Sequence, residues 1–135
     1  MIDVTSQALP LLKASRGNVV NITSGLVDNP MPANSVYTAS KAAVLSPART
    51  WAKEPAPLGI RVNSVAAGAT KTPLYDKLGL SAQEAKDYEA AVEQTVPPGR
   101  FAEPDEIAPV VGFVASEEAA YVTGSHYGVD GGFGI

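Results

Sequence analysis

The sequence predicts an α/β protein with parallel strands and helices on both faces of the sheet. Two observations support this fold class. Helical and strand patterns alternate along the chain, in the order helix, strand, helix, strand, helix, helix, strand. The strand patterns are short runs that end at glycines. Because a three-stranded parallel sheet is small for such a fold, we expect the 135 residues to be part of a larger domain.

The first helix and strand are predicted near the N-terminus. Residues 2–14 place apolar side chains at helical spacing, with Pro10 as the discordant residue. Residues 18–24, Asn-Val-Val-Asn-Ile-Thr-Ser, are an apolar, β-branched run, which is typical of a buried strand. Residues 26–35 are rich in proline and asparagine and are predicted as a loop.

The second helix and strand follow that loop. Residues 36–54 are alanine-rich and of helical length, and Ser35 is the predicted N-cap. Pro47 lies inside this stretch and predicts a kink or a cost of roughly 3 kcal/mol. Residues 60–65, Ile-Arg-Val-Asn-Ser-Val, alternate apolar and polar side chains and predict the second strand.

Two helices and a short strand are predicted in the rest of the chain. Residues 81–95 begin with Ser81 followed three residues later by Glu84, the pattern of a capping box. Residues 104–116 begin with a proline and two acidic residues, which suit the first turn of a helix. Residues 126–129 are the last predicted strand, and the glycine-rich sequence that ends the chain is interpreted as a turn.

The composition excludes several function classes. The chain has no cysteine and one histidine, His126, so disulfides, thiolate metal sites and a histidine-rich metal cluster are ruled out. Ten Lys and Arg against 14 Asp and Glu give a net charge of -4, and the basic residues are scattered, so no nucleic-acid partner is expected. No membrane span or signal peptide is recognised. We therefore expect a cytoplasmic protein with no membrane partner and no bound metal.

Ser24, Tyr37 and Lys41 are the side chains that could carry chemistry. Tyr37 and Lys41 are four residues apart, so they share one helix face, one turn apart. An ammonium near a phenol favours the phenolate and lowers its pKa from about 10, which makes tyrosine usable as a general acid or base. Ser24 ends the first strand, where ligands bind in parallel sheets. Taken alone, this spacing is common by chance, and the residues would then be structural.

Other polar residues are given simpler interpretations. Ser24 together with His126 suggests a hydrolase. We reject this function, because residues 22–26 lack the first and last glycines of a nucleophile elbow. Arg100 is interpreted as a structural or interface residue rather than a catalytic one.

Several ordered motifs resemble the short-chain dehydrogenase/reductase family. They are Ser24 at a strand end thirteen residues before Tyr37, Tyr-Thr-Ala-Ser-Lys at 37–41, Gly-Ile-Arg-Val-Asn-Ser-Val-Ala-Ala-Gly-Ala-Thr-Lys-Thr-Pro at 59–73, and the tail at 97–132. The resemblance implies that residues 1–135 are the C-terminal portion of a single doubly wound, Rossmann-type domain whose glycine-rich N-terminal half is absent. It also implies that the three strands are neighbours, with the sheet open beside residues 18–24.

The resemblance further implies an oxidoreductase that interconverts an alcohol and a carbonyl of a small molecule with NAD or NADP. Tyr37 would exchange the proton, Lys41 would hold the nicotinamide ribose and lower the pKa of Tyr37, and Ser24 would polarise the substrate oxygen. The cofactor-binding residues would be Tyr37, Lys41, Gly68, Ala69, Thr70 and Thr72. Glycine suits position 68 because a close backbone approach to a ligand favours it.

Departures from the family pattern leave a second function class open. Ala67 replaces the usual proline, Pro47 is unusual in the catalytic helix, and the glycine-rich turn and Asn-Asn-Ala-Gly motif are missing. The alternative is a truncated, non-catalytic remnant or oligomerisation module that keeps the family's interface. For either function the resemblance implies a homo-oligomer, a dimer or tetramer paired through residues 2–14, residues 36–54 and the C-terminal segment. Met1 falls inside what should be a longer helix, which favours a fragment. We expect these residues alone to bind dinucleotide weakly.

Overall fold

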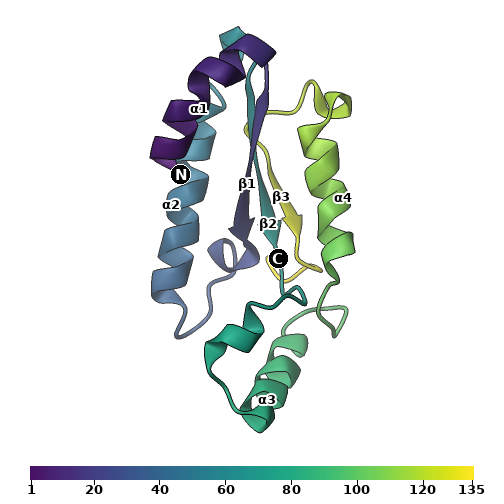
Figure 1. The fold of residues 1–135 in the computed structure, drawn as a ribbon. Coiled ribbons are helices and arrows are strands. Elements are labelled where there is room, and N and C mark those ends of the chain that lie inside the picture. Colours follow the sequence, from purple (N-terminus) through teal and green to yellow (C-terminus); the bar gives the residue numbers. More distant parts are fainter.

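The computed structural model describes residues 1–135 and contains a three-stranded parallel sheet (Figure 1). The strands are β1 (Asn18–Ser24), β2 (Arg61–Ala67) and β3 (His126–Val129). They lie in the order β1-β2-β3, and the register places Ser24 opposite Ala67 and Ala67 opposite Val129. The predicted fold class, the parallel pairing and the position of β1 at an edge of the sheet are confirmed.

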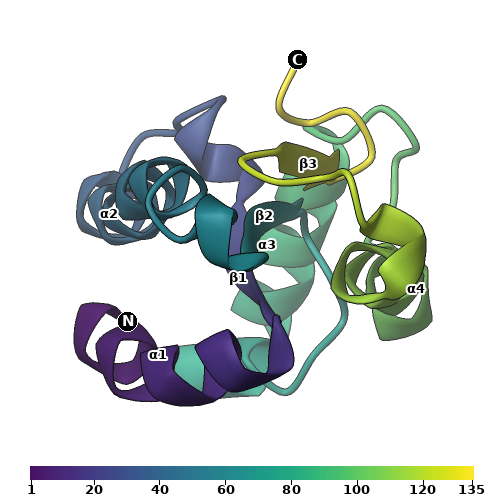
Figure 2. The same cartoon turned by 90° about the horizontal axis from the view of Figure 1, so that it is seen from above.

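Helices cover both faces of this sheet. They are α1 (Ile2–Ser15), α2 (Ser35–Trp51), α3 (Ala82–Glu93) and α4 (Pro104–Ala115). Viewed from above, α1 and α2 lie on one side of the sheet and α4 on the other (Figure 2). Helix α3 covers neither face and lies beyond the carboxyl ends of the strands (Figure 1). None of the helices combines the length and the apolar character that crossing a membrane requires.

The start of α2 and the extent of β2 differ from the sequence prediction. Asn34, not Ser35, is the N-cap of α2, and its side chain donates to the Pro32 carbonyl at 3.0 Å instead of accepting from the helix. Pro47 does not interrupt α2, although the helix ends at Trp51 rather than at residue 54. Strand β2 extends two residues past the predicted end because its backbone continues to pair with both neighbouring strands.

The main apolar cluster lies between β1, β2 and the two helices on their shared face. Its buried members are Ala48, Ala52, Ile60 and Val62, with Leu9, Leu12, Val19 and Trp51 packed against them. Alanines on α2 let the helix approach the sheet closely. On the other face, the Arg61 guanidinium donates to the carbonyls of Val114 and Ser116, each at 2.9 Å, and so ties β2 to the end of α4.

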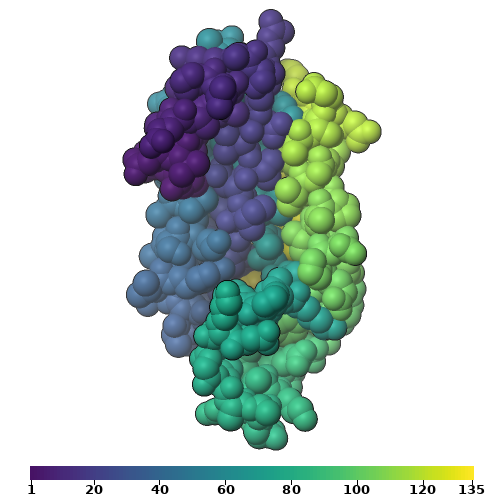
Figure 3. All heavy atoms as spheres, in the orientation of Figure 1, coloured from purple at the N-terminus to yellow at the C-terminus, as the bar shows by residue number.

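Residues 71–101 form a separate lobe below the carboxyl ends of the strands (Figure 3). The lobe joins the sheet domain through a short parallel bridge, in which the Ala102 amide donates to Ala69 and the Lys71 amide donates to Ala102. Helix α3 in this lobe buries none of its residues. Its first turn has the predicted capping box between Ser81 and Glu84, which confirms that feature of the sequence analysis.

Candidate functional site

Lys41 connects the helix that carries Tyr37 to the strand that carries Ser24. The Lys41 Nζ donates to the Ile22 carbonyl at 3.2 Å, and Ile22 lies two residues before Ser24 on β1. The same ammonium lies 5.8 Å from the centroid of the Tyr37 ring, within the range of a cation–π contact. The structure thus brings Lys41 to Tyr37 on one side and to the end of β1 on the other.

Ser24 is buried at the carboxyl end of β1, with 8% of its surface exposed. It is the N-cap of the short 3-10 helix η1 (Gly25–Val27), and its Oγ accepts a hydrogen bond from the Leu26 amide at 3.3 Å. The hydroxyl donates to no group in the chain. Its proton is therefore free to donate to a group outside the chain.

Tyr37 lies in the first turn of α2 with 43% of its surface exposed, and its hydroxyl makes no hydrogen bond within the chain. The next residue, Thr38, carries a buried hydroxyl with no hydrogen-bond partner, and so does Ser64 on β2. Unsatisfied buried polar atoms are rare in folded proteins and call for an explanation such as a bound water or a functional role. One of them is here adjacent in sequence to the candidate acid–base residue.

Gly68, in the loop after β2, packs tightly against Asp130 in the turn after β3. A Cβ atom on Gly68 would lie 2.5 Å from the Asp130 Cα and 3.0 Å from the Asp130 carbonyl oxygen. The Gly68 amide also donates to the Val129 carbonyl at 3.1 Å. Glycine was expected at position 68 because the backbone would approach a ligand closely, whereas the structure requires glycine there for packing against the turn after β3.

Thr70 and Thr72, in the same loop, differ in which of their polar groups form hydrogen bonds within the chain. In the bridge to Ala102, the groups used are the Ala69 carbonyl and the Lys71 amide, so the Thr70 amide and carbonyl point away from it. The Thr70 hydroxyl donates to the Gly68 carbonyl at 3.0 Å. Thr72 is exposed, and its carbonyl accepts from the backbone of the lobe. Thr72 therefore offers a ligand its side chain, whereas the Thr70 backbone lies within reach of the Tyr75 hydroxyl.

An aromatic cluster lies next to this loop, at the top of the lobe. The Tyr75 ring packs edge-on against Phe101 with centroids 5.1 Å apart and lies 6.0 Å from the Tyr88 ring of α3. Burial raises the pKa of the Tyr75 phenol, and the nearby Tyr88 adds to the rise, while the Thr70 backbone partly offsets it. Tyr75 is consequently a neutral hydroxyl near neutral pH, and it interacts with the Thr70 backbone of the loop.

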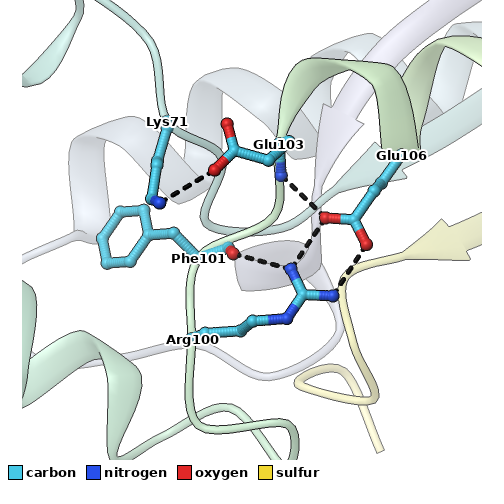
Figure 4. A network of polar contacts seen from close by, with 5 residues as sticks. All are labelled: Lys71, Arg100, Phe101, Glu103 and Glu106. Atoms are coloured by element: carbon cyan, nitrogen blue, oxygen red, sulfur yellow. Dashed lines mark hydrogen bonds and ion pairs between the residues drawn. The ribbon is translucent and has the colours of Figure 1, made fainter.

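Ion pairs fix the two ends of the lobe (Figure 4). Lys71 Nζ lies 2.8 Å from Glu103 Oε1, and the Arg100 guanidinium makes two 2.7 Å contacts with the Glu106 carboxylate. Arg100 also donates to the Phe101 carbonyl at 3.0 Å. The hydrogen bond from Arg100 is the main cause that lowers the pKa of Glu106 to about 2. Of the two predicted roles for Arg100, structural or interface residue, these contacts support the structural one.

The role of Asp130 in the turn after β3 was not predicted from the sequence. Asp130 lies in the glycine-rich turn, and its carboxylate accepts from the amides of Gly132 and Gly134, each at 3.0 Å. An aspartate two residues before a glycine is a recognisable turn signal, and it could have predicted the role of Asp130.

His126 contacts Thr23, and no contact joins it to Ser24, which agrees with rejecting the hydrolase interpretation of Ser24 and His126. No group of three or more His, Asp or Glu side chains able to hold a metal ion is present.

The chain matches known proteins over nearly its whole length. A family model described as enoyl-(acyl carrier protein) reductase matches residues 1–134. The 3-oxoacyl-(acyl-carrier-protein) reductase FabG of Thermotoga maritima is 42% identical over 138 residues, which cover 100% of this chain and 53% of that protein. The chain therefore spans about half the length of the curated relatives it matches.

Solved structures give the same result for the fold. The Cj0485 dehydrogenase has a TM-score of 0.87 at 32% identity, and the match covers 96% of this chain and 50% of the other. A short-chain dehydrogenase/reductase from Caenorhabditis elegans, solved with its cofactor, has a TM-score of 0.86 at 31% identity over 98% of this chain and 51% of the other. The three strands and four helices thus correspond to half of such a domain.

Proposed function

Because the chain belongs to the short-chain dehydrogenase/reductase family, we propose that its residues are the catalytic half of an NAD- or NADP-dependent oxidoreductase that interconverts an alcohol and a carbonyl. The observation that carries this proposal is the position of Lys41. Its ammonium is fixed on the Ile22 carbonyl at 3.2 Å and lies 5.8 Å from the Tyr37 ring centroid, beside the strand that ends at Ser24.

The residues present fit the nicotinamide end of such a cofactor. Lys41 uses one of its three N–H donors on Ile22, which leaves two for ribose hydroxyls. The Thr70 backbone and the exposed Thr72 hydroxyl line the loop that would meet the nicotinamide amide, with Gly68 and Ala69 holding that loop in place. When bound, the nicotinamide ring supplies or takes up the hydride.

The protein's own residues would then handle the proton and the substrate oxygen. The uncommitted Ser24 proton hydrogen-bonds the substrate oxygen, which fixes its orientation. Tyr37 transfers its phenolic proton to that oxygen during reduction, or takes the proton from the alcohol during oxidation. The Lys41 ammonium favours the phenolate that results, because an opposite charge nearby stabilises the charged form.

The relatives suggest the substrate class. The Thermotoga maritima protein is a 3-oxoacyl-(acyl-carrier-protein) reductase, so we propose a 3-oxoacyl group as the carbonyl substrate. The aromatic cluster of Tyr75, Tyr88 and Phe101 supports this, because it gives the lobe an apolar wall beside the loop.

The test is a fusion in which the N-terminal half of the Thermotoga maritima relative completes the domain. Tyr37→Phe should lower turnover by about 100-fold or more, the usual contribution of a general acid, while NADH or NADPH affinity is retained. Tyr121→Phe is the matched control, because Tyr121 is 104% exposed and makes no contact with the site. Wild-type turnover in the Tyr37→Phe fusion would refute the assignment.

A second function, that of a non-catalytic oligomerisation module, is favoured by the exposed apolar side chains of α1 and α2. Ile2, Val4 and Leu11 on α1 are between 58% and 75% exposed, and Val36 on α2 is 84% exposed. The 135 residues contain no glycine-rich turn before a helix, which supplies most pyrophosphate contacts in this fold. We therefore propose that the chain alone forms a dimer or tetramer and binds dinucleotide weakly.

Titration calorimetry with NADH and NADPH, together with sizing by light scattering, distinguishes the two functions. A monodisperse monomer would exclude the module. Micromolar dinucleotide affinity with turnover would show that the chain is an enzyme without the N-terminal half.

A further inference from the structure

His126 contacts the residues on both sides of the candidate catalytic serine. Its Nε2 lies 2.9 Å from Thr23 Oγ1, and its Nδ1 lies 3.7 Å from Asp28 Oδ2. Thr23 precedes Ser24, and Asp28 is the C-cap of the short helix that Ser24 begins. Because β2 separates β3 from β1, the imidazole reaches across the central strand to make these contacts. We call residues 23–29 the Ser24 turn.

The hydrogen bonds of Thr23 decide which ring nitrogen carries the proton. Thr23 Oγ1 lies 3.2 Å from the Val65 carbonyl oxygen, which can only accept, so the single hydroxyl proton is used there. His126 Nε2 must then be the donor to Thr23. In the neutral ring, Nδ1 has no proton and faces Asp28 at a distance longer than a hydrogen bond. The Nε2–H bond to Thr23 is therefore the contact that holds the turn.

The environment makes this bond strong. Thr23 is 2% exposed, and the His126 side chain is 11% exposed, so water does not compete for either partner. The segment after β3 reinforces the contact at two further points. The Asn29 side-chain Nδ2 donates to the Phe133 carbonyl at 2.8 Å, and Gly25 fits so closely that a Cβ there would lie 2.8 Å from Asp130 Oδ2.

We propose that His126 is a positioning residue that holds the Ser24 turn against β3 and so orients the Ser24 hydroxyl. The Ser24 Oγ accepts from the Leu26 amide within this turn, so its direction depends on how the turn is held. The role of Ser24 rests on the function proposed above, whereas the contact by which His126 holds the Ser24 turn does not. His126 itself touches no reacting group.

The first experiment reads the tautomer. His126 is the single histidine of the chain, so its ring nitrogens are identified in a ¹⁵N–¹H correlation spectrum without assignment. We expect the Nε2–H tautomer in the neutral ring of the wild-type protein. The Nδ1–H tautomer would overturn the assignment of Nε2 as the donor, because His126 would then accept the Thr23 proton.

The second experiment uses two amide substitutions as a matched pair. His126→Gln places an amide N–H near the position of Nε2, and His126→Asn places one near Nδ1. Amide hydrogen exchange at Leu26 and Asp28, which both bond within the Ser24 turn, is the readout. We expect His126→Asn to raise exchange at both amides about tenfold, the effect of one lost hydrogen bond, while His126→Gln stays near wild type.

Thr23→Val should reproduce the His126→Asn effect, because it removes the acceptor and keeps the shape of the side chain. Equal exchange in His126→Gln and His126→Asn would refute the positioning role. In the fusion protein, His126→Asn should lower kcat more than it raises KM, and His126→Gln should restore kcat. If amide exchange changes as expected but the Ser24→Ala fusion keeps full turnover, the proposed function is refuted, while the role of His126 in holding the Ser24 turn is supported.

Discussion

The contact between Gly68 and Asp130 predicts how the smallest possible substitution will behave. In Gly68→Ala, the new Cβ would lie 2.5 Å from the Asp130 Cα and 2.9 Å from its Cβ, closer than real Cβ atoms approach one another. Two backbone segments must therefore move apart by about 1 Å to reach ordinary carbon–carbon contact. Gly68 does not have a positive φ, so the substitution tests packing alone.

The expected loss of stability follows from these distances. Overpacking of this kind costs about 1–3 kcal/mol, and the smaller conformational entropy of the unfolded alanine variant offsets roughly 0.4–1 kcal/mol. For 135 residues, the unfolding entropy is about 0.28 kcal/mol/K near the midpoint, so a net loss of about 1–2 kcal/mol lowers Tm by about 4–7 °C.

Gly112→Ala is the matched control for this prediction. A Cβ on Gly112 has nothing within 4 Å, and the residue is exposed inside α4, where alanine is favoured over glycine by about 0.5–1 kcal/mol. Thermal unfolding followed by circular dichroism should therefore give Tm changes of opposite sign. A Gly68→Ala protein as stable as Gly112→Ala would show that the loop does not pack on Asp130 as described.

Two further predictions concern the ends of the lobe and the start of α3. Arg100→Gln removes the main cause of the low pKa of Glu106, which is about 2 in the folded protein against an ordinary 4.5. Since this pKa is lowered by folding, the stabilisation is present above about pH 4.5 and is lost as the pH falls towards 2, so the wild-type and Arg100→Gln Tm values should differ near neutral pH and converge near pH 2. Ser81→Ala should raise the pKa of Glu84, which the Ser81 hydroxyl and amide now lower, as seen by NMR titration of the side chain. It should also speed amide exchange in the first turn of α3 and leave α4 unchanged.

Much of the fold was predictable because the strand signals are local. The run at residues 18–24 and the strand at 126–129 have the bounds that the sequence indicates, and the Ser81 capping box forms as its spacing predicts. The N-cap of α2 was not predictable from propensity, since asparagine and serine are adjacent and both favour that position.

The candidate site was predictable only where its residues are close in sequence. The spacing of Tyr37 and Lys41 predicts a shared helix face, and the ammonium does lie over the ring. The bond between Thr23 and His126 joins residues 103 positions apart, and no periodicity reports such a contact. The reason for Gly68 was equally hidden, because it depends on how the turn after β3 meets the loop after β2.

The short bridge at the base of the lobe has a consequence for how this protein could diversify. Residues 71–101 leave and rejoin the sheet domain at neighbouring points, and two backbone hydrogen bonds between Ala69, Lys71 and Ala102 close the junction. A segment with such ends is a cassette: its length and side chains can be exchanged while the strand register and the pairing of Lys41 with β1 remain as they are. Grafting the corresponding segment of a relative between residues 70 and 102 should therefore leave the strand register unchanged.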